Sequence, residues 1–189
     1  MRMNLDAFAV RIPKALSEET CKSMVSELES DKVHWEEHTF FYNDDKTFNT
    51  RSTKELDTSY AVLEKHEEVM THLWLSVKDY LEKLNYQWFT GWEGYTPPRY
   101  NRYQENAEMA PHCDHIHSIF DGDRQGVPIL SILGCLNEDY EGGELIMWDD
   151  YKVGLKTGDF LVFPSNFLYP HRVSPVTSGT RYSLVSWAW

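Results

Sequence analysis

The sequence of 189 residues predicts a mainly β protein with N-terminal helices, folded as a double-stranded β-helix, the jelly-roll or cupin-like barrel. After residue 86 the chain reads as eight short β-prone runs separated by turn residues, which is typical of an all-β architecture. Before that point, two segments repeat apolar residues at helical spacing. The helices therefore precede the strands instead of alternating with them, which argues against a parallel sheet.

The first 40 residues are expected to contain an edge strand, a short helix and a second strand. Residues 7–12 alternate weakly in polarity, and Pro13 then stops the strand. Ser17 is the expected N-cap of an amphipathic helix, because two glutamates follow it and apolar residues then recur every three or four positions. Residues 34–42 are aromatic and β-prone, so they predict a strand.

A polar loop and a long helix are expected next. Residues 43–58 are charged and poorly periodic, and loops of this length often act as lids. Thr58 or Ser59 is the expected cap of a helix that runs to about Leu84 and presents one apolar stripe to the sheet. We therefore predict one domain, residues 1–189, in which residues 1–90 form a helical buttress with a lid loop and residues 91–189 form the barrel core.

The C-terminal half is expected to supply the barrel. Glycine pairs and single glycines between the runs provide the backbone freedom that tight turns need. The eight expected strands cover residues 98–103, 107–115, 127–136, 143–148, 151–155, 159–164, 169–175 and 181–188.

Composition excludes several classes of function and compartment. The formal net charge of −12 disfavours nucleic-acid binding, which needs a basic face. The three cysteines are odd in number and far apart, which suits reduced thiols. No run approaches the roughly 18 apolar residues of a membrane span, and the first residues lack the apolar core of a signal peptide. We expect a cytoplasmic protein that binds neither nucleic acid nor membrane.

Two short stretches predict a metal site. His112 and Asp114 lie two residues apart, so in a strand they point to the same side and offer a nitrogen and an oxygen to one ion. His171 is the expected third ligand, because Arg181 follows it by ten residues with a planar fork suited to a dicarboxylate. Two histidines and one carboxylate with open positions are the ligand set of non-haem Fe(II) oxygenases.

A run of motifs extends this pattern and carries a family resemblance. The motifs are His112-x-Asp114, Cys135-Leu136-Asn137, Tyr140-x-Gly142-Gly143-Glu144-Leu145, Gly158-Asp159-x-Leu161-x-Phe163, His171-x-Val173 and Gly179-x-Arg181-Tyr182-Ser183-Leu184-x-x-Trp187. Their order resembles the 2-oxoglutarate- and Fe(II)-dependent dioxygenases, and within them the prolyl 4-hydroxylase-like branch. The resemblance covers the C-terminal half strongly, whereas the first 90 residues match only in general style.

The resemblance implies an enzyme and its cofactors. His112, Asp114 and His171 would bind Fe(II), and 2-oxoglutarate and O2 would take the remaining positions on the metal, with ascorbate as an optional further cofactor. The reaction would convert 2-oxoglutarate to succinate and CO2 and hydroxylate an unactivated C–H. Asp114 favours hydroxylation over halogenation, because related halogenases carry Gly or Ala at that position.

The resemblance also implies a cosubstrate site. Arg181 would pair with the far carboxylate of 2-oxoglutarate, and Tyr103 resembles a tyrosine that such enzymes place beside it. Cellular prolyl hydroxylases often carry a tyrosine before the Leu-Asn pair, where this chain has Cys135. Ser183 shares a strand face with Arg181, so we expect its hydroxyl to take over that contact.

The substrate is expected to be a prolyl residue in a peptide or protein, as in the prolyl 4-hydroxylases. Arg51, Arg99, Arg102 and Trp187 are the candidate substrate residues, and Trp187 is expected to line the site near iron. One alternative is a hydroxylase of a free amino acid or small metabolite. Others are a cupin-like metalloenzyme that does not use 2-oxoglutarate and a jelly roll that only binds its partner. The oligomeric state is left open.

Overall fold

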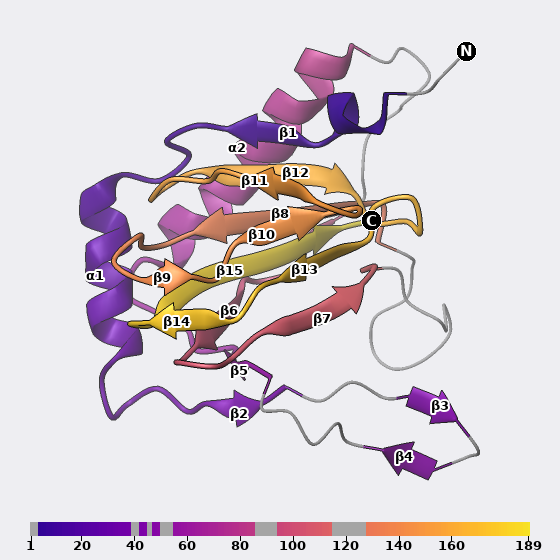
Figure 1. The fold of residues 1–189 in the computed structure, drawn as a ribbon. Coiled ribbons are helices and arrows are strands. Elements are labelled where there is room, and N and C mark those ends of the chain that lie inside the picture. The colour runs from indigo at the N-terminus through magenta and orange to yellow at the C-terminus, as the bar shows by residue number, and fades with distance from the viewer. Residues whose placement is uncertain (1–3, 39–41, 45–46, 50–54, 86–93, 115–127) are drawn as a thin grey trace.

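The structure is a computed structural model that describes residues 4–38, 42–44, 47–49, 55–85, 94–114 and 128–189. Within these ranges, two α-helices lie against antiparallel sheets that form a double-stranded β-helix (Figure 1). The mainly β fold class with N-terminal helices is therefore confirmed.

The elements of the N-terminal part are the 3-10 helix η1 (Leu5–Phe8), β1 (Val10–Ile12), α1 (Glu18–Leu28), β2 (Glu36–Glu37), β3 (Tyr42–Asp44), β4 (Thr47–Asn49), β5 (Asp57–Ser59) and α2 (His66–Leu84). Those of the C-terminal part are β6 (Arg99–Tyr103), β7 (Met109–His112), β8 (Leu130–Cys135), β9 (Glu141–Gly142), β10 (Leu145–Met147), β11 (Tyr151–Val153), β12 (Phe160–Pro164), β13 (His171–Val173), β14 (Val176–Ser178) and β15 (Arg181–Ala188).

The two main sheets are the walls of the barrel. The larger sheet has the strand order β1-β12-β8-β15-β6-β5-β2, and the smaller has the order β11-β10-β13-β7. Two short pairs, β14 with β9 and β3 with β4, complete the described strands. Strands that are neighbours in these sheets are often far apart in sequence, as expected for a jelly roll. Strand β15, the longest, lies at the centre of the larger sheet between β8 and β6.

Helix α1 begins as the sequence predicts. The Ser17 hydroxyl accepts a hydrogen bond from the Thr20 amide at 3.0 Å and so satisfies one free donor of the first turn. The apolar stripe of the helix then buries Cys21, Met24 and Leu28 against the larger sheet.

Helix α2 starts later than the sequence predicts. Thr58 and Ser59 belong to strand β5, which pairs with β6, and the helix begins only at His66. Local periodicity cannot reveal this, because the competing interaction is a strand pairing with residues about 40 positions away. The C-terminal end at Leu84 is as expected, with Asn85 in the left-handed conformation that terminates many helices.

Several other boundaries also differ from expectation. Residues 7–12 form the end of η1 and then β1, which does lie at a sheet edge. The region 34–42 contains β2 and the start of β3, while the expected loop 43–58 contains β4 and the start of β5. The two-residue strand β9 and the three-residue strand β14 were not expected, because such short pairs have too little sequence to show an alternation.

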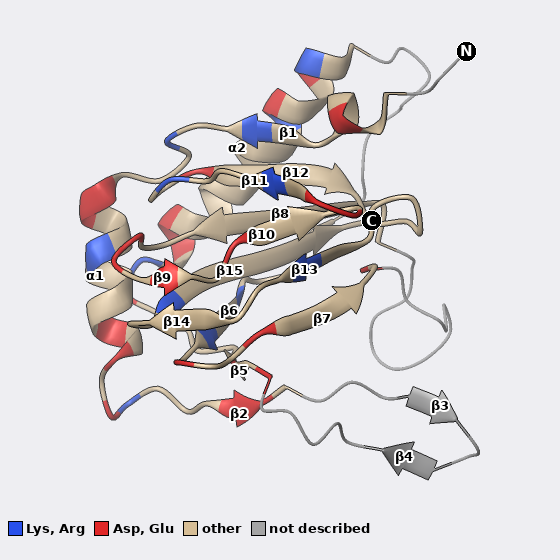
Figure 2. Ribbon diagram, in the orientation of Figure 1, with Lys and Arg blue, Asp and Glu red and all other residues tan. Residues whose placement is uncertain are grey.

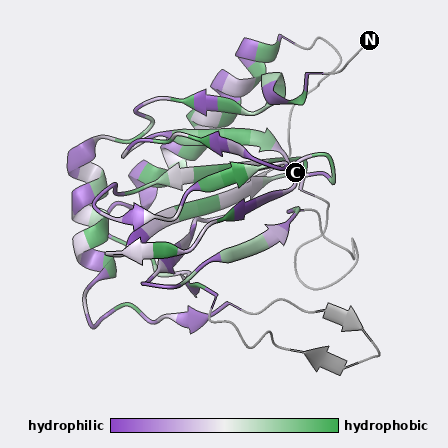
Figure 3. Ribbon diagram, in the orientation of Figure 1, coloured by the Kyte–Doolittle hydropathy of each residue, from purple (hydrophilic) through white to green (hydrophobic). Residues whose placement is uncertain are grey.

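The hydrophobic core has two parts, one for each interface between the layers of the fold. One lies between the helices and the larger sheet, where Leu73, Val77 and Phe160 are fully buried. The other lies between the two sheets and contains Met147 and Phe163. Figure 3 shows the corresponding hydrophobic segments along the central strands, with more hydrophilic segments at the helices and outer turns. Strand β12 contributes to both parts because its two faces are buried on different sides.

Acidic residues lie mainly on outer elements, including α1, β2 and β9 (Figure 2). Among the described residues, neither helix is both long and apolar enough to cross a membrane.

Candidate metal centre and cosubstrate cavity

Strand pairing brings the candidate metal ligands together. His112 ends β7 and His171 begins β13, and the two residues are direct partners across this antiparallel pair. Asp114 follows His112 by two residues. One ligand atom from each of the three residues lies within 4.8 Å of the others, a spacing that fits a single ion. A search of the described residues for groups of His, Cys, Asp or Glu side chains at metal spacing finds these three residues.

Both imidazoles are oriented by the backbone in the same way. The Nδ1–H of His112 donates to the Ala110 carbonyl at 2.8 Å, and that of His171 donates to the Tyr169 carbonyl at 3.1 Å. Because a carbonyl can only accept, each ring carries a proton on Nδ1, so in the neutral ring Nε2 is the nitrogen that can bind a metal. The Nε2 atoms lie 3.4 and 3.7 Å from Asp114 Oδ1.

Asp114 is held ionised and fixed in position. Burial alone would raise the pKa of its carboxyl, but the protonated forms of His171 and His112 outweigh burial and leave the pKa well below its usual range. Its second oxygen, Oδ2, accepts a hydrogen bond from the Trp187 indole Nε1 at 3.1 Å. One oxygen thus faces the imidazoles while the other is anchored by Trp187. Burial lowers the pKa of His171, which favours the neutral ring that a metal needs.

Arg181 is a buried cation at the other end of the site. It starts β15 directly opposite Tyr103 of β6, and its guanidinium carbon lies 4.8 Å from the centre of the Tyr103 ring. Its Nη1 donates to the Ser183 hydroxyl at 3.1 Å, and a further hydrogen bond joins it to Tyr140. Burial raises the pKa of both phenols, so they stay neutral donors.

The surroundings of Arg181 fit an anionic ligand. Only 6% of the residue is exposed, and no acidic side chain pairs with it among the described residues. Its Nε is buried without a hydrogen-bond partner. A buried guanidinium is costly unless its charge and its donors are satisfied. A carboxylate bound in two-point fashion would satisfy both, and the neighbouring hydroxyls offer further donors.

One cavity connects Arg181 to the candidate metal ligands. Strand alternation turns Arg99, Asn101 and Tyr103 of β6 to the same face as the alternate residues Arg181, Ser183 and Val185 of β15. These six residues line the cavity together with His112, Asp114 and His171. The expected association of Tyr103 and Ser183 with Arg181 is therefore present in the structure.

The four candidate substrate residues have different positions. Arg99 lines the cavity, and Trp187 contacts Asp114. Arg102 lies on the opposite face of β6, where it pairs with Asp57 at 2.9 Å and stacks 4.4 Å from the Trp35 ring centre, so the structure does not bring it to the cavity. Arg51 lies outside the described residues.

Sequence reasoning missed two polar residues of the site. Tyr140 lies beside Arg181, and Gly143 makes room for this contact. A Cβ at residue 143 would come within 3.1 Å of both Tyr140 and Arg181, and the φ of 62° at Gly143 also favours glycine. The glycine pair after Tyr140 was therefore a usable signal. Asn101 lines the cavity with its Oδ1 buried and unpartnered, and its signal is the two-residue alternation with Arg99 and Tyr103.

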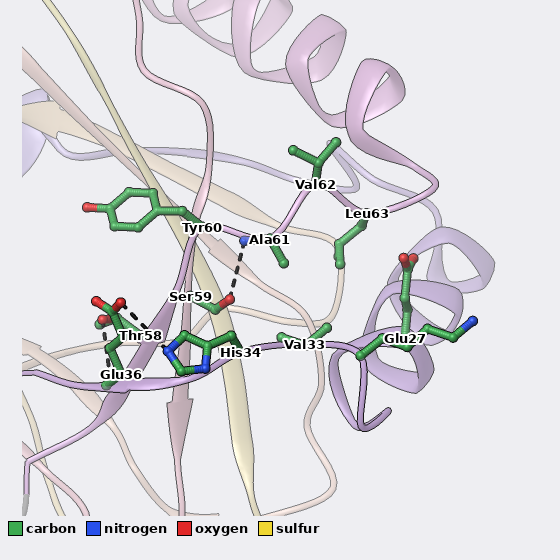
Figure 4. Close-up of a pocket in the computed structure, with 11 residues that line it drawn as sticks. Glu27, Val33, His34, Glu36, Thr58, Ser59, Tyr60, Ala61, Val62 and Leu63 are labelled. Atoms are coloured by element: carbon green, nitrogen blue, oxygen red, sulfur yellow. Dashed lines mark hydrogen bonds and ion pairs between the residues drawn. The ribbon is translucent and has the colours of Figure 1, made fainter.

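A second and larger cavity of about 560 Å³ lies beside the end of α1, strands β2 and β5, and the segment that leads into α2 (Figure 4). Glu27, His34, Glu36 and Tyr60 contribute polar groups to its lining. None of the site residues predicted from the sequence contributes to the described lining. The predicted metal ligands and Arg181 line the smaller cavity instead.

Comparison with protein families matches residues 98–189 to the 2OG-Fe(II) oxygenase superfamily. Among curated proteins, a PKHD-type hydroxylase of Xylella fastidiosa strain M23 is 42% identical over 101 residues, which cover 48% of this chain and 43% of that protein. A PKHD-type hydroxylase of Delftia acidovorans is 37% identical over 99 residues, covering 48% and 42%. This chain thus spans less than half the length of these relatives.

Solved structures extend the likeness to the whole fold. A viral collagen prolyl hydroxylase from Paramecium Bursaria Chlorella virus-1, solved with 2OG, has a TM-score of 0.64 at 15% identity, covering 98% of each chain. A Pseudomonas putida prolyl-4-hydroxylase has a TM-score of 0.65 at 19% identity, covering 96% of this chain and 91% of its own. A Trichoplax adhaerens prolyl hydroxylase, in complex with a peptide fragment of hypoxia inducible factor, has a TM-score of 0.68 at 16% identity, covering 97% and 84%.

Proposed function

We propose that this chain, whose residues 98–189 match the 2OG-Fe(II) oxygenase superfamily, is a 2-oxoglutarate- and Fe(II)-dependent dioxygenase that hydroxylates a prolyl residue in a peptide or protein. The single observation that carries the proposal is one cavity that joins two histidines and an aspartate at metal spacing to a buried arginine without an acidic partner among the described residues. The overall reaction converts 2-oxoglutarate, O2 and a C–H to succinate, CO2 and a C–OH. One oxygen atom of O2 enters succinate and the other enters the C–OH.

The proposed roles follow from the contacts. His112, Asp114 and His171 would hold Fe(II) through Nε2, Oδ1 and Nε2, because these atoms face one another. Fe(II) supplies the activation of O2 that couples oxidative decarboxylation of 2-oxoglutarate to hydroxylation. The protein contributes the orientation of the imidazoles through two carbonyls and the anchoring of Asp114 through Trp187.

Arg181 would hold the far carboxylate of 2-oxoglutarate. Its free Nε and its fork geometry suit two parallel hydrogen bonds, and Tyr103, Tyr140 and Ser183 surround the position that this carboxylate would take. Ser183 is the direct cross-strand partner of Cys135, while the Cys135 thiol itself donates to the Asn137 carbonyl at 3.2 Å. Of these two residues, Ser183 is therefore the one whose side chain contacts Arg181, which supports the role expected for it.

The prolyl substrate is supported by names among the relatives: solved structures of the same fold include prolyl hydroxylases, one of them bound to a peptide fragment. A small molecule with a saturated C–H is the alternative substrate, since the same cavity could accept it. Ascorbate as a further cofactor stays a prediction.

Succinate formation tests the proposal. We expect the protein with Fe(II), 2-oxoglutarate and O2 to release succinate, and proline-containing peptides to increase the rate and gain one oxygen atom by mass spectrometry. His171→Ala should abolish turnover, and Arg181→Gln should raise the KM for 2-oxoglutarate by about tenfold or more, since a hydrogen bond to a charged group is lost.

Two matched variants serve as controls. His72→Ala removes a histidine of helix α2, and Arg172→Gln changes the outward neighbour of His171 on β13; both should retain turnover. Binding of Fe(II) without any consumption of 2-oxoglutarate would contradict the dioxygenase and favour a cupin-like metalloenzyme.

A further inference from the structure

The cavity contains a second arginine that the binding of 2-oxoglutarate does not use. Arg99 begins strand β6 and lines the cavity together with the candidate metal ligands. Its guanidinium carbon lies 5.1 Å from the centre of the Trp187 ring, the same indole that donates to Asp114. Arg99 therefore lies on the side of the metal site that faces Trp187.

Arg99 lacks the partner that a structural arginine normally has. No acidic side chain pairs with it among the described residues, and its Nε is buried without a hydrogen-bond partner. Arg102, three residues later, provides the contrast: it stacks on Trp35 in a similar way but also forms two hydrogen bonds with Asp57. The stacking orients the Arg99 fork, yet the charge itself is left for a ligand.

The register separates Arg99 from Arg181. Arg181 is opposite Tyr103, whereas Arg99 is opposite Val185, four residues further along. At about 3.3 Å per residue, this places the two backbones roughly 13 Å apart. Arg99 also leans toward Trp187, two residues beyond Val185, and thus away from Arg181. One 2-oxoglutarate molecule held by Arg181 therefore leaves Arg99 unsatisfied.

Asn101 adds a second unmatched group between the two arginines. It lies opposite Ser183 on the cavity floor, is 4% exposed, and its Oδ1 has no hydrogen-bond partner. Buried polar atoms are rarely left unpaired in a native protein, and three of them, in Arg99, Asn101 and Arg181, lie on one floor. This arrangement suits a site in which two bound molecules supply the missing hydrogen-bond partners.

We propose that Arg99 binds a carboxylate of the substrate, so that the enzyme selects prolyl compounds in which an anionic group lies close to the hydroxylated ring. This inference rests on the proposed function and specifies its substrate class. The carboxylate belongs either to the prolyl unit itself or to an acidic side chain of a neighbouring residue, since both present the same planar group to the guanidinium. A neutral prolyl peptide would cover the half-buried guanidinium without pairing its charge.

Matched neutral and anionic probes test this proposal on protein loaded with Mn(II) and 2-oxoglutarate. N-acetylproline and N-acetylprolinamide differ only in the carboxylate, and N-acetyl-Pro-Glu-amide and N-acetyl-Pro-Gln-amide differ only in the acidic side chain. Calorimetric titration should give at least one anionic probe an affinity about tenfold or more above that of its neutral partner. The pair that shows the difference identifies the source of the carboxylate.

Two variants of Arg99 and one control variant test whether the preference for the anionic probe depends on the Arg99 guanidinium. Arg99→Gln should abolish the difference within the pair, and Arg99→Lys, which keeps the charge but not the fork, should reduce it. Arg102→Gln, on the opposite face of the same strand, should keep it. Equal affinities within both pairs, or a preference that persists in Arg99→Gln, would overturn the proposal.

The affinity for 2-oxoglutarate, measured on the same samples, separates the two claims. A protein that binds metal but not 2-oxoglutarate would refute the proposed function. A protein that binds 2-oxoglutarate and yet does not distinguish the probes would refute only the assignment of Arg99.

Discussion

Replacing Trp187 by Phe should weaken metal binding with little effect on the fold. The indole Nε1 donates to Asp114 Oδ2 at 3.1 Å, and Phe removes this donor but keeps an aromatic ring under Arg99. Only 7% of the Asp114 side chain is exposed, so water cannot readily replace the lost hydrogen bond. The carboxylate would then be free to rotate away from the two imidazoles.

The size of the effect follows from the kind of bond. A hydrogen bond to a charged group contributes about 1.5–3 kcal/mol, and each 1.4 kcal/mol corresponds to about a factor of ten in affinity. We therefore expect the dissociation constant for Mn(II) or anaerobic Fe(II) to rise by about 10- to 100-fold, the range typical for residues that orient a metal ligand.

Isothermal titration of metal-free protein measures this change, and Trp35→Phe is the matched control. Trp35 also has an arginine over its ring, and its indole donates to the Leu28 carbonyl at 3.3 Å, on the helix side of the sheet. Urea unfolding of both variants separates loss of metal affinity from loss of stability. Wild-type metal affinity in Trp187→Phe, or an equal loss in Trp35→Phe, would refute the reasoning.

Two further predictions concern the rest of the chain. Ser17→Ala removes the cap that accepts from the Thr20 amide and should lower the free energy of unfolding by about 0.5–2 kcal/mol in urea denaturation, whereas an unchanged midpoint would show that the cap contributes nothing. Cys113 should react with iodoacetamide before Cys21 and Cys135, because it is only partly buried while burial raises the pKa of Cys21 to about 12; peptide mapping that finds Cys21 modified first in the folded protein would contradict the packing.

The candidate site was largely predictable because its signals are short-range or carried by motifs. The two-residue spacing of His112 and Asp114 predicted that their side chains share one side, and both line the cavity although β7 ends at His112. Strand alternation places Arg181 and Ser183 on one face of β15. The charge of Arg181 restricts its role further, because an arginine inside a barrel needs an anionic partner. These arguments need no knowledge of which strands pair.

The remaining features depend on pairing register, which one sequence does not reveal. Arg99 and Arg102 look alike in sequence, and the pairings of β6 with β15 and with β5 decide that Arg99 faces the cavity and Arg102 meets Asp57. The same holds for the indole of Trp187, which reaches Asp114 across the barrel. The start of α2 was missed for a related reason, because the β5 pairing with β6 is decided by distant residues.

The central claim is that one cavity binds Fe(II) and 2-oxoglutarate together, and anaerobic addition of both to metal-free protein tests it most directly. Chelation of the metal by 2-oxoglutarate gives a weak visible charge-transfer band. We expect the band in the wild-type protein, its loss in His171→Ala, and a much higher 2-oxoglutarate requirement in Arg181→Gln. A wild-type protein that binds Fe(II) but never develops the band, even at saturating 2-oxoglutarate, would contradict the account.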